Sequence, residues 1–197
     1  MPFRAPNHHP LAGLLALPLA AVLGLSACSS PTPRSNLAPP GPTPLSSSPG
    51  IVQIALQPPP VAAPLGDIFP LYVLLDTGGQ ALQGVQVYLD YDPQVLRPEL
   101  VTGATGPSGD LVLTSDADDP GRIDLELRSS TGTIAAGFYP LATIVFTAVA
   151  APPTTTVQFT TSGRRTTRAF AASGDLPLNL RDTTISIRVP PTSAGAP

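Results

Sequence analysis

The chain of 197 residues contains no Trp and no Lys, and it holds only one Cys, one Met and two His. Both His residues lie within residues 1–27. A Ser-His-Asp triad needs a histidine, and most transition-metal sites need histidine or thiolate. If the first 27 residues are removed on export and the thiol of the lone Cys28 is blocked, the remaining chain lacks both chemistries. The net charge of −3, without a run of Arg, also gives no electrostatic footprint for nucleic acid.

The N-terminus has the pattern of an export signal. Arg4 gives it a weak positive charge, and residues 11–25 form an apolar run that is short for a membrane-spanning helix. The run ends in Leu-Ser-Ala-Cys at 25–28, which resembles the lipobox of bacterial lipoprotein precursors. The resemblance implies that Cys28 carries a diacyl anchor. We predict a signal peptide at 1–27 and an exported protein, lipid-anchored to the cell membrane or outer membrane, with its domain outside the cytoplasm. The alternative is an ordinary secretory signal cut at the same place.

Two segments have the composition of disordered chain. Residues 28–50 are rich in Pro and Ser and hold almost no large apolar side chains, so they cannot bury enough surface to offset chain entropy. We predict a disordered linker there, which at about 3.1 Å per residue reaches roughly 70 Å. Residues 190–197 have the same character and are predicted to form a disordered tail.

The region between them, 51–189, reads as short strands separated by turn signals. Abundant Pro and Gly disfavour long helices, whereas Thr, Val and Leu suit strands. The expected strands are 51–56, 68–76, 82–91, 111–114, 122–128, 141–149, 155–160 and 183–189. Eight or nine short strands at this spacing predict an all-β fold, a single two-sheet sandwich or jelly roll.

Two of these segments alternate cleanly between apolar and polar residues. In 82–91 the inward set is Val85, Val87, Leu89 and Tyr91. In 122–128 it is Ile123, Leu125 and Leu127. The outward set is Gln86, Tyr88, Asp90, Asp124, Glu126 and Arg128. Beyond the first segment, Asp92 and Pro93 predict a turn, after which Val95 and Leu96 fold back over the sandwich edge.

Four motifs in a fixed order resemble the cohesin domain, the jelly-roll module that binds dockerins in cellulosome scaffolds. They are GVQVYLDYDPQVLRP (84–98), GRIDLELRSSTGT (121–133), IAAGFYPLATIVFTAV (134–149) and FAASGDLPLNLRDTTISI (170–187). The resemblance implies a non-catalytic, cohesin-like sandwich that recognises a protein partner of the dockerin-bearing kind, such as an enzyme of polysaccharide degradation.

In cohesins, outward residues of the strand that ends in Tyr-Asp-Pro help to form the partner-binding face. In this sequence the positions that correspond are Gly84, Gln86, Tyr88 and Asp90. Asp124, Glu126 and Arg128 extend them into a charged platform, and Tyr88 is a candidate anchor because Tyr is enriched at binding hot spots. The alternative is that all of these residues form a solvated sheet face.

Other charged residues allow weaker hypotheses. The carboxylate pairs Asp90/Asp92 and Asp124/Glu126 could in principle act as the two carboxylates of a glycosidase do, but hydrated strand faces have the same pattern. Asp116, Asp118 and Asp119 could hold Ca²⁺, but they lack EF-hand spacing and precede a Pro-Gly turn. The basic cluster of Arg164, Arg165 and Arg168 fits a solvated hairpin loop better than a site for anionic lipid. No other cofactor is expected.

Two further functions stay open at this point. Direct binding of polysaccharide needs exposed aromatic rings in a row, and the chain offers only Tyr72, Tyr88, Tyr91 and Tyr139, with Tyr91 directed inward. A structural role in the cell envelope would need neither a glycan nor a dockerin.

Overall fold

The computed structural model describes residues 42–45, 48–59, 61–103 and 110–190. Within these ranges the backbone forms fifteen strands, four of them only two residues long, and no helix. In the described part there is accordingly no helix long and apolar enough to cross a bilayer. The predicted all-β sandwich is confirmed. The predicted signal peptide, Cys28 and the tail from residue 191 onward lie outside the described residues.

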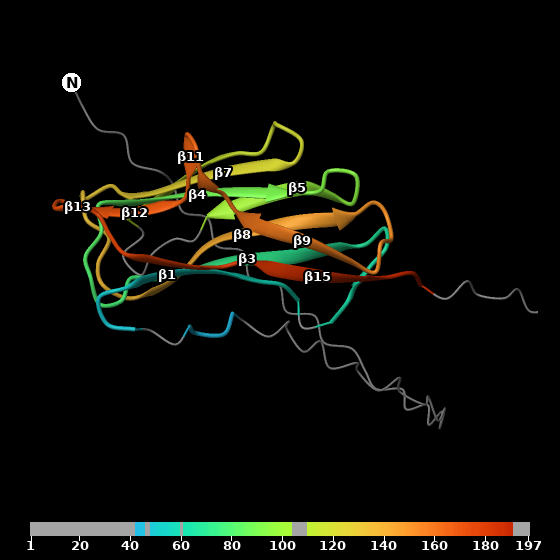
Figure 1. Cartoon of the computed structure of the whole chain (residues 1–197), viewed down its shortest axis with the longest axis horizontal. Helices are drawn as coiled ribbons and strands as arrows, with labels where there is room; N and C mark the ends of the chain where they lie inside the picture. Colours follow the sequence, from blue (N-terminus) through green and yellow to red (C-terminus); the bar gives the residue numbers. More distant parts are fainter. Residues whose placement is uncertain (1–41, 46–47, 60, 104–109, 191–197) are drawn as a thin grey trace, which may run out of the picture. The chain divides into compact units, whose positions relative to one another are not determined.

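One layer is a five-stranded sheet. Its strands are β1 (Val52–Gln57), β3 (Ile68–Asp76), β5 (Leu96–Gly103), β8 (Phe138–Ala148) and β14 (Leu178–Arg181). Their order is β14-β1-β3-β8-β5, and only the β14-β1 pair is parallel. β1 and β3 lie side by side on one side of the molecule in Figure 1.

The other layer is an eight-stranded sheet. Its members are β2 (Ala63–Pro64), β4 (Gly84–Tyr91), β6 (Leu111–Asp116), β7 (Arg122–Ser129), β9 (Thr154–Phe159), β12 (Arg168–Ala171), β13 (Gly174–Asp175) and β15 (Thr183–Arg188). β4 pairs with β7 along one edge. Along its other edge β4 pairs first with β12 and then with β9. Between β9 and β12 the chain makes a small hairpin of β10 (Thr161–Ser162) and β11 (Arg165–Thr166).

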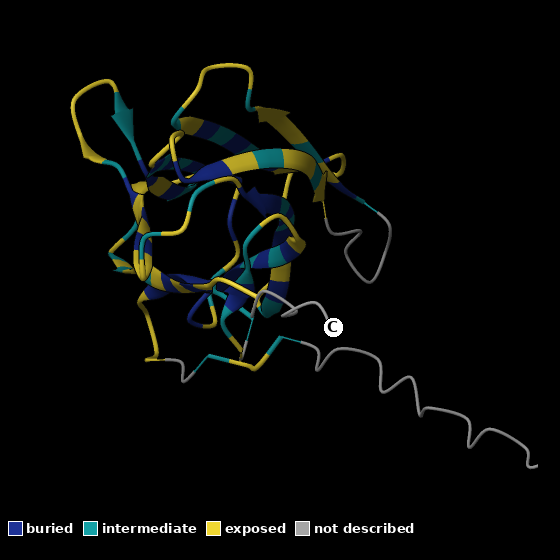
Figure 2. Ribbon diagram, turned by 90° about the vertical axis from the view of Figure 1, so that its right-hand side faces the viewer, coloured by how far each residue is buried: buried dark blue, intermediate teal, exposed yellow. Residues whose placement is uncertain are grey.

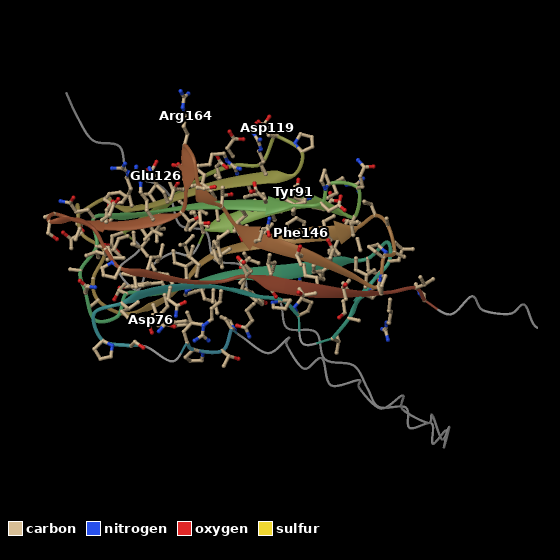
Figure 3. All side chains as sticks on the ribbon, viewed as in Figure 1. Asp76, Tyr91, Asp119, Glu126, Phe146 and Arg164 are labelled. Atoms are coloured by element: carbon tan, nitrogen blue, oxygen red, sulfur yellow. The ribbon has the colours of Figure 1, made fainter. Side chains whose placement is uncertain are left out.

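Apolar side chains fill the space between the layers. The ribbon in Figure 2 changes between buried and more exposed residues along the strands. Phe146 of β8 is fully buried and stacks on Phe69 of β3, with ring centroids 6.1 Å apart. Its ring also meets the edge of Tyr91 of β4 at 5.4 Å. Because Tyr91 belongs to the opposite sheet, this aromatic cluster joins the two layers (Figure 3).

The inward residues predicted for β4 and β7 are all buried in this core, each 8% exposed or less. The turn after β4 also follows the prediction, since the Asp92 carboxylate accepts the N–H of Gln94 at 2.9 Å. Val95 and Leu96 are buried as expected. However, Leu96 begins β5, a strand of eight residues that the sequence pattern did not predict. Its ladder is interrupted by a bulge between Pro98 and Leu100, which hides the period-two signal.

The described residues that precede β1 contact the domain. The backbone N–H of Thr43 donates to Oε1 of Gln57 at 2.9 Å, and Nε2 of Gln57 donates back to the Thr43 hydroxyl at 3.2 Å. Further along, the N–H of Gly50 donates to the carbonyl of Gly78 at 2.9 Å. Gly78 has φ of +63°, and an added Cβ would lie 2.3 Å from the carbonyl oxygen of Ile51, so only glycine fits this close approach.

Candidate functional site

The six outward residues predicted for the partner-binding face lie in two neighbouring columns of the eight-stranded sheet. In the ladder between β4 and β7, Gln86 stands opposite Glu126 and Tyr88 opposite Asp124. Asp90 and Arg128 continue the same two columns toward opposite ends of the face. The alternation within each strand was predictable, and the antiparallel register now brings the two sets together.

β6 adds a third column, because it pairs with the outer edge of β7. Val112 stands opposite Arg128, Thr114 opposite Glu126 and Asp116 opposite Asp124. Val112 is 53% exposed, and Thr114 and Asp116 are exposed as well. We call the outward surface of β4, β7 and β6 the charged face.

The hairpin β10-β11 stands on this charged face, over its β4 column. Arg165 reaches back from the hairpin to the sheet. Its Nη1 donates to Asp90 at 2.7 Å and its Nε donates to Asp124 at 3.0 Å. A third donor, Nη2, contacts both Asp124 and the carbonyl oxygen of Leu89. The guanidinium also lies 5.5 Å from the centroid of the Tyr88 ring. We call this arrangement the Arg165 clasp.

Two threonines at the base of the hairpin replace the ladder that the hairpin interrupts. The N–H of Tyr88 donates to the hydroxyl of Thr167 at 3.1 Å, and the N–H of Thr160 donates to the carbonyl of Tyr88 at 2.8 Å. The Thr160 hydroxyl also donates to Asp90 at 2.9 Å. The backbone of β4 therefore stays satisfied where β9 gives way to β12, and the hairpin is held at both ends.

The other end of the charged face is ordered by a second set of contacts. Arg128 forms a salt bridge with Glu126, with Nη2 2.6 Å from Oε1. Gln86 donates to the same carboxylate at 3.2 Å and accepts from Nε of Arg168 at 2.7 Å. Both guanidiniums lie 5.8 Å from the ring centroid of Phe170.

Gly84 differs from its expected place among the outward, accessible positions. It is buried, because the Phe170 ring covers it: a Cβ on Gly84 would lie 2.6 Å from Cζ of that ring. The accessible part of the β4 column therefore starts at Gln86. Sequence reasoning missed Phe170, since nothing in its local pattern places it across from Gly84.

The charges of the face hold one another ionised. Partial burial raises the pKa of Asp90, but the hydrogen bonds from Arg165 and Thr160 and the nearby positive charge outweigh burial, so the pKa lies below its ordinary value. The hydrogen bond from Arg128 lowers the pKa of Glu126 against a smaller effect of burial. The hydrogen bond with Asp124 raises the pKa of Arg165. Asp90, Glu126 and Arg165 are thus fully charged at neutral pH.

The basic cluster predicted as a solvated loop divides into three environments. Arg164 is exposed at the tip of the hairpin and points away from the sheet (Figure 3). Arg165 turns back into the clasp, so the solvated-loop interpretation is wrong for it. Arg168 is exposed to solvent but lies on strand β12 rather than in a loop. The outward carboxylates of Asp90 and Asp124 were the one sequence signal for a cation at this place. The sequence does not indicate which of the basic side chains pairs with them.

The acidic loop considered for Ca²⁺ has a local structural function. The Asp116 carboxylate accepts the N–H of Asp118 at 3.1 Å, which closes the turn before β7. Asp116 and Asp119 line a small cavity of about 50 Å³ together with Asp124 and two arginines, Arg122 and Arg165. In the part of the chain that the structure describes, no three acidic, His or Cys side chains are grouped to hold a metal ion.

Comparison with known proteins identifies the fold. No protein-family model matches the sequence, and no curated protein matches it. Solved structures do match, and cohesins are among them. A cohesin module of a family 33 glycoside hydrolase from Clostridium perfringens superposes with a TM-score of 0.60 at 14% identity, covering 72% of this chain and 99% of the module.

Two further matches are cohesins from other sources. A non-cellulosomal cohesin from Archaeoglobus fulgidus gives a TM-score of 0.53 at 13% identity, over 70% of this chain and 91% of that one. The cohesin of a type I cohesin–dockerin complex from Clostridium thermocellum gives 0.56 at 9% identity, over 75% of this chain and 99% of the matched chain. The described domain is therefore a two-sheet sandwich with a cohesin-like fold.

Proposed function

We propose that the chain is a non-catalytic, surface-anchored binding module whose charged face recognises a protein partner of the dockerin type. The observation that carries this proposal is the charged face itself. It is a three-column sheet surface on a cohesin-like fold, on which Arg165 holds Asp90 and Asp124 and Arg128 holds Glu126. Several of the matched cohesins were crystallised with dockerins. Charges that are already oriented reduce the side-chain entropy lost on binding.

The pairing of the charges argues against catalysis on this face. A general acid or base needs a pKa close to the working pH. Here the pKa values of Asp90 and Glu126 are shifted in the opposite direction, and both carboxylates are held by arginine. Asp92, which with Asp90 formed the other candidate pair of glycosidase carboxylates, accepts a backbone N–H in the turn after β4.

The positions of the tyrosines favour a protein partner over a polysaccharide. Tyr91 and Tyr139 are buried, at 8% and 7% exposure. Tyr88 lies beneath Arg165, and Tyr72 belongs to the opposite sheet. The four tyrosines thus form no row of exposed rings on one face on which a sugar chain could stack.

The hairpin restricts how a partner can approach. It stands over the β4 column, so the open part of the charged face is the strip of β7 and β6, from Glu126 and Arg128 to Thr114. Tyr88, first considered as an interface anchor, is engaged with Arg165 and contributes by supporting the clasp. Glu126, whose side chain is 34% exposed, is the better candidate for direct contact with a partner.

The experiment is a capture with the immobilised mature chain from secreted and envelope proteins of the source organism, with and without Ca²⁺. Recovery of a Ca²⁺-dependent partner with paired Asp-rich loops is the expected result. Glu126→Arg should then weaken binding at least about tenfold, because reversal of an interface charge costs more than its removal. Glu99→Arg on the opposite face is the matched control and should bind normally. Equal binding by the two variants would exclude the charged face, and recovery of polysaccharide alone would favour the glycan function.

The lipid anchor is a separate part of the proposal and rests on the lipobox-like sequence. Intact-mass measurement on the processed protein should show a diacylated Cys28, and Cys28→Ser should release the chain from the membrane fraction. A wild-type chain with an unmodified thiol would contradict the anchor and leave the charged face untouched.

A further inference from the structure

The outer surface of the five-stranded sheet carries a strip of apolar side chains. The ladder registers place Leu100 of β5 opposite Val145 of β8, and Val145 opposite Pro70 of β3. On β3, Ile68 and Tyr72 flank Pro70 on the same side of the sheet. Ile68 is 69% exposed and Leu100 is 55% exposed, and the other three are half-buried. We call these five residues the apolar strip.

Charged side chains occur only at the margins of this sheet surface, within the ladder positions that the structure describes. Asp76 lies at one end, where its carboxylate accepts the N–H of Gly78. Near the other end Arg97 and Glu99 pair with each other at 2.9 Å, and the Glu99 carboxylate also accepts the hydroxyl of Thr147 on β8 at 2.6 Å. Arg181 lies on the edge strand β14. The five residues of the strip are themselves uncharged, and the Arg97–Glu99 ion pair borders them at Thr147, the ladder partner of Ile68.

The chain enters the domain across this same surface. Thr43 is hydrogen-bonded to Gln57 of β1, a ladder partner of Tyr72. Thr43, Pro44 and Leu45 line one cavity of about 320 Å³ with Ala55, Leu74 and their neighbours. The segment before β1 therefore lies beside the apolar strip, on its β1 side.

The free edge of this sheet is protected against pairing with another strand. β5 carries Pro98, the bulge at Glu99 and the Arg97–Glu99 ion pair, three devices that oppose strand addition. A second copy of the chain that extends the sheet is thus disfavoured at the very edge that borders the strip. An occupant of the strip would therefore have to cover a flat apolar surface without backbone pairing.

We propose that the apolar strip rests on the lipid bilayer to which Cys28 anchors the chain, so that the charged face points away from the membrane. This inference rests on the lipid anchor of the proposed function. About 14 residues separate Cys28 from the described segment, a span of roughly 43 Å when extended. Such a tether keeps the domain at a high effective concentration near the bilayer, so a weak apolar contact suffices.

The test depends on the fact that Cys28 is the only cysteine of the sequence. Because lipidation blocks the thiol of Cys28, a new cysteine in the lipidated chain can be labelled uniquely. Ile68→Cys places an environment-sensitive fluorophore on the apolar strip. Val112→Cys places it at an exposed aliphatic position of the charged face and is the matched control. Both variants are reconstituted in phosphatidylethanolamine–phosphatidylglycerol vesicles that carry a nitroxide near the lipid headgroups.

The expected result is nitroxide quenching several-fold stronger at position 68 than at position 112, with a blue shift only at 68. Adding Leu100→Asp to the Ile68→Cys chain should remove most of this difference. Equal quenching at the two positions in protein that floats with the vesicles would overturn the inference but leave the anchor intact. Protein that does not float at all would overturn the anchor as well. A blue shift at 68 that depends on protein concentration, without quenching by lipid, would assign the strip to a second copy and overturn the inference.

Discussion

The two outer surfaces of the sandwich differ in the side chains that they expose and in how these side chains are held. On the charged face, polar groups are held in place by one another: Arg165 joins Asp90 and Asp124, and Arg128 joins Glu126. On the opposite sheet, the apolar strip has no such network, and its most prominent member, Ile68, is 69% exposed. Both surfaces stand on one shared core of closely packed strands.

The difference indicates which surface is suited to specificity. Fixed charges select partners by complementarity and penalise a wrong partner, whereas a small apolar strip adds affinity without much selection. A module with one surface of each kind is suited to contact a chosen partner on one side and a non-specific apolar surface on the other. Four experiments, from the largest expected effect to the smallest, test how far the two surfaces are independent.

Phe146→Ala should disturb both surfaces together. Its ring joins Phe69 of one sheet to Tyr91 of the other, so its removal leaves a cavity between the layers. We expect the free energy of unfolding to fall by about 3–5 kcal/mol, measured by chemical denaturation followed by far-ultraviolet circular dichroism. Amide exchange should accelerate in both β3 and β4. Acceleration in only one of the two strands would mean that the sheets are not coupled through this cluster.

Arg165→Ala should affect the charged face alone. The Arg165 side chain is 22% exposed and its two carboxylate partners are 37% and 39% exposed, so solvent screening limits the loss to about 1–2 kcal/mol. Arg164→Ala, one residue away at the exposed tip of the hairpin, is the control and should leave stability unchanged. If the two variants behave alike, the clasp does not hold the hairpin. Amide exchange at 160–167 gives the same comparison locally.

The clasp should also be sensitive to acid. Because the folded-state pKa of Asp90 lies below its ordinary value of 3.8, the stability that its ionised form contributes is complete above that pH. It is then lost as the pH falls through the lowered pKa. The difference in melting temperature between wild type and Asp90→Asn should therefore be largest at neutral pH and shrink below 3.8. In an Arg165→Ala background this difference in melting temperature should depend less on pH. An unchanged profile would mean that the pH dependence arises from a group other than the Asp90–Arg165 pair.

Ile68→Ser and Leu100→Ser should barely change stability, by about 0.5 kcal/mol or less, because exposed positions away from special contacts tolerate substitution. Leu71 provides the contrast, since it lies on the same strand but is fully buried. Leu71→Ala should cost about 2–5 kcal/mol in the same denaturation experiment. A large loss from Ile68→Ser would show that the strip belongs to the folded core rather than to a surface.

The alternation of β4 and β7 made much of this architecture predictable. Successive side chains of a strand point to opposite faces, so Val85 and Gln86 receive opposite environments whatever the rest of the fold does. The turn at Asp92 is equally local, because its carboxylate bonds the backbone two residues on. The fold class and the six outward residues of β4 and β7 follow from such short-range rules, and the cohesin resemblance places these six on one surface.

The features that sequence reasoning missed depend on longer range or on broken periodicity. Strand β5 was not predicted, because Pro98 and the bulge beside it disrupt the alternation of apolar and polar residues. The Phe170 ring over Gly84 depends on a pairing between strands far apart in the sequence. Neither feature has a signature within the window over which a local pattern is read.

What the sequence by itself determined is which side chains of each strand face the core and which face outward, since that depends only on the period of an extended chain. The tertiary structure decided which outward side chains meet. Arg165 is separated by 75 residues from Asp90 and by 41 from Asp124, and two other basic residues lie beside it. Only the packing of β9, β4 and β7 side by side, with the hairpin folded over them, gives that one guanidinium both carboxylates, because charge pairing depends on distance in space and not along the chain.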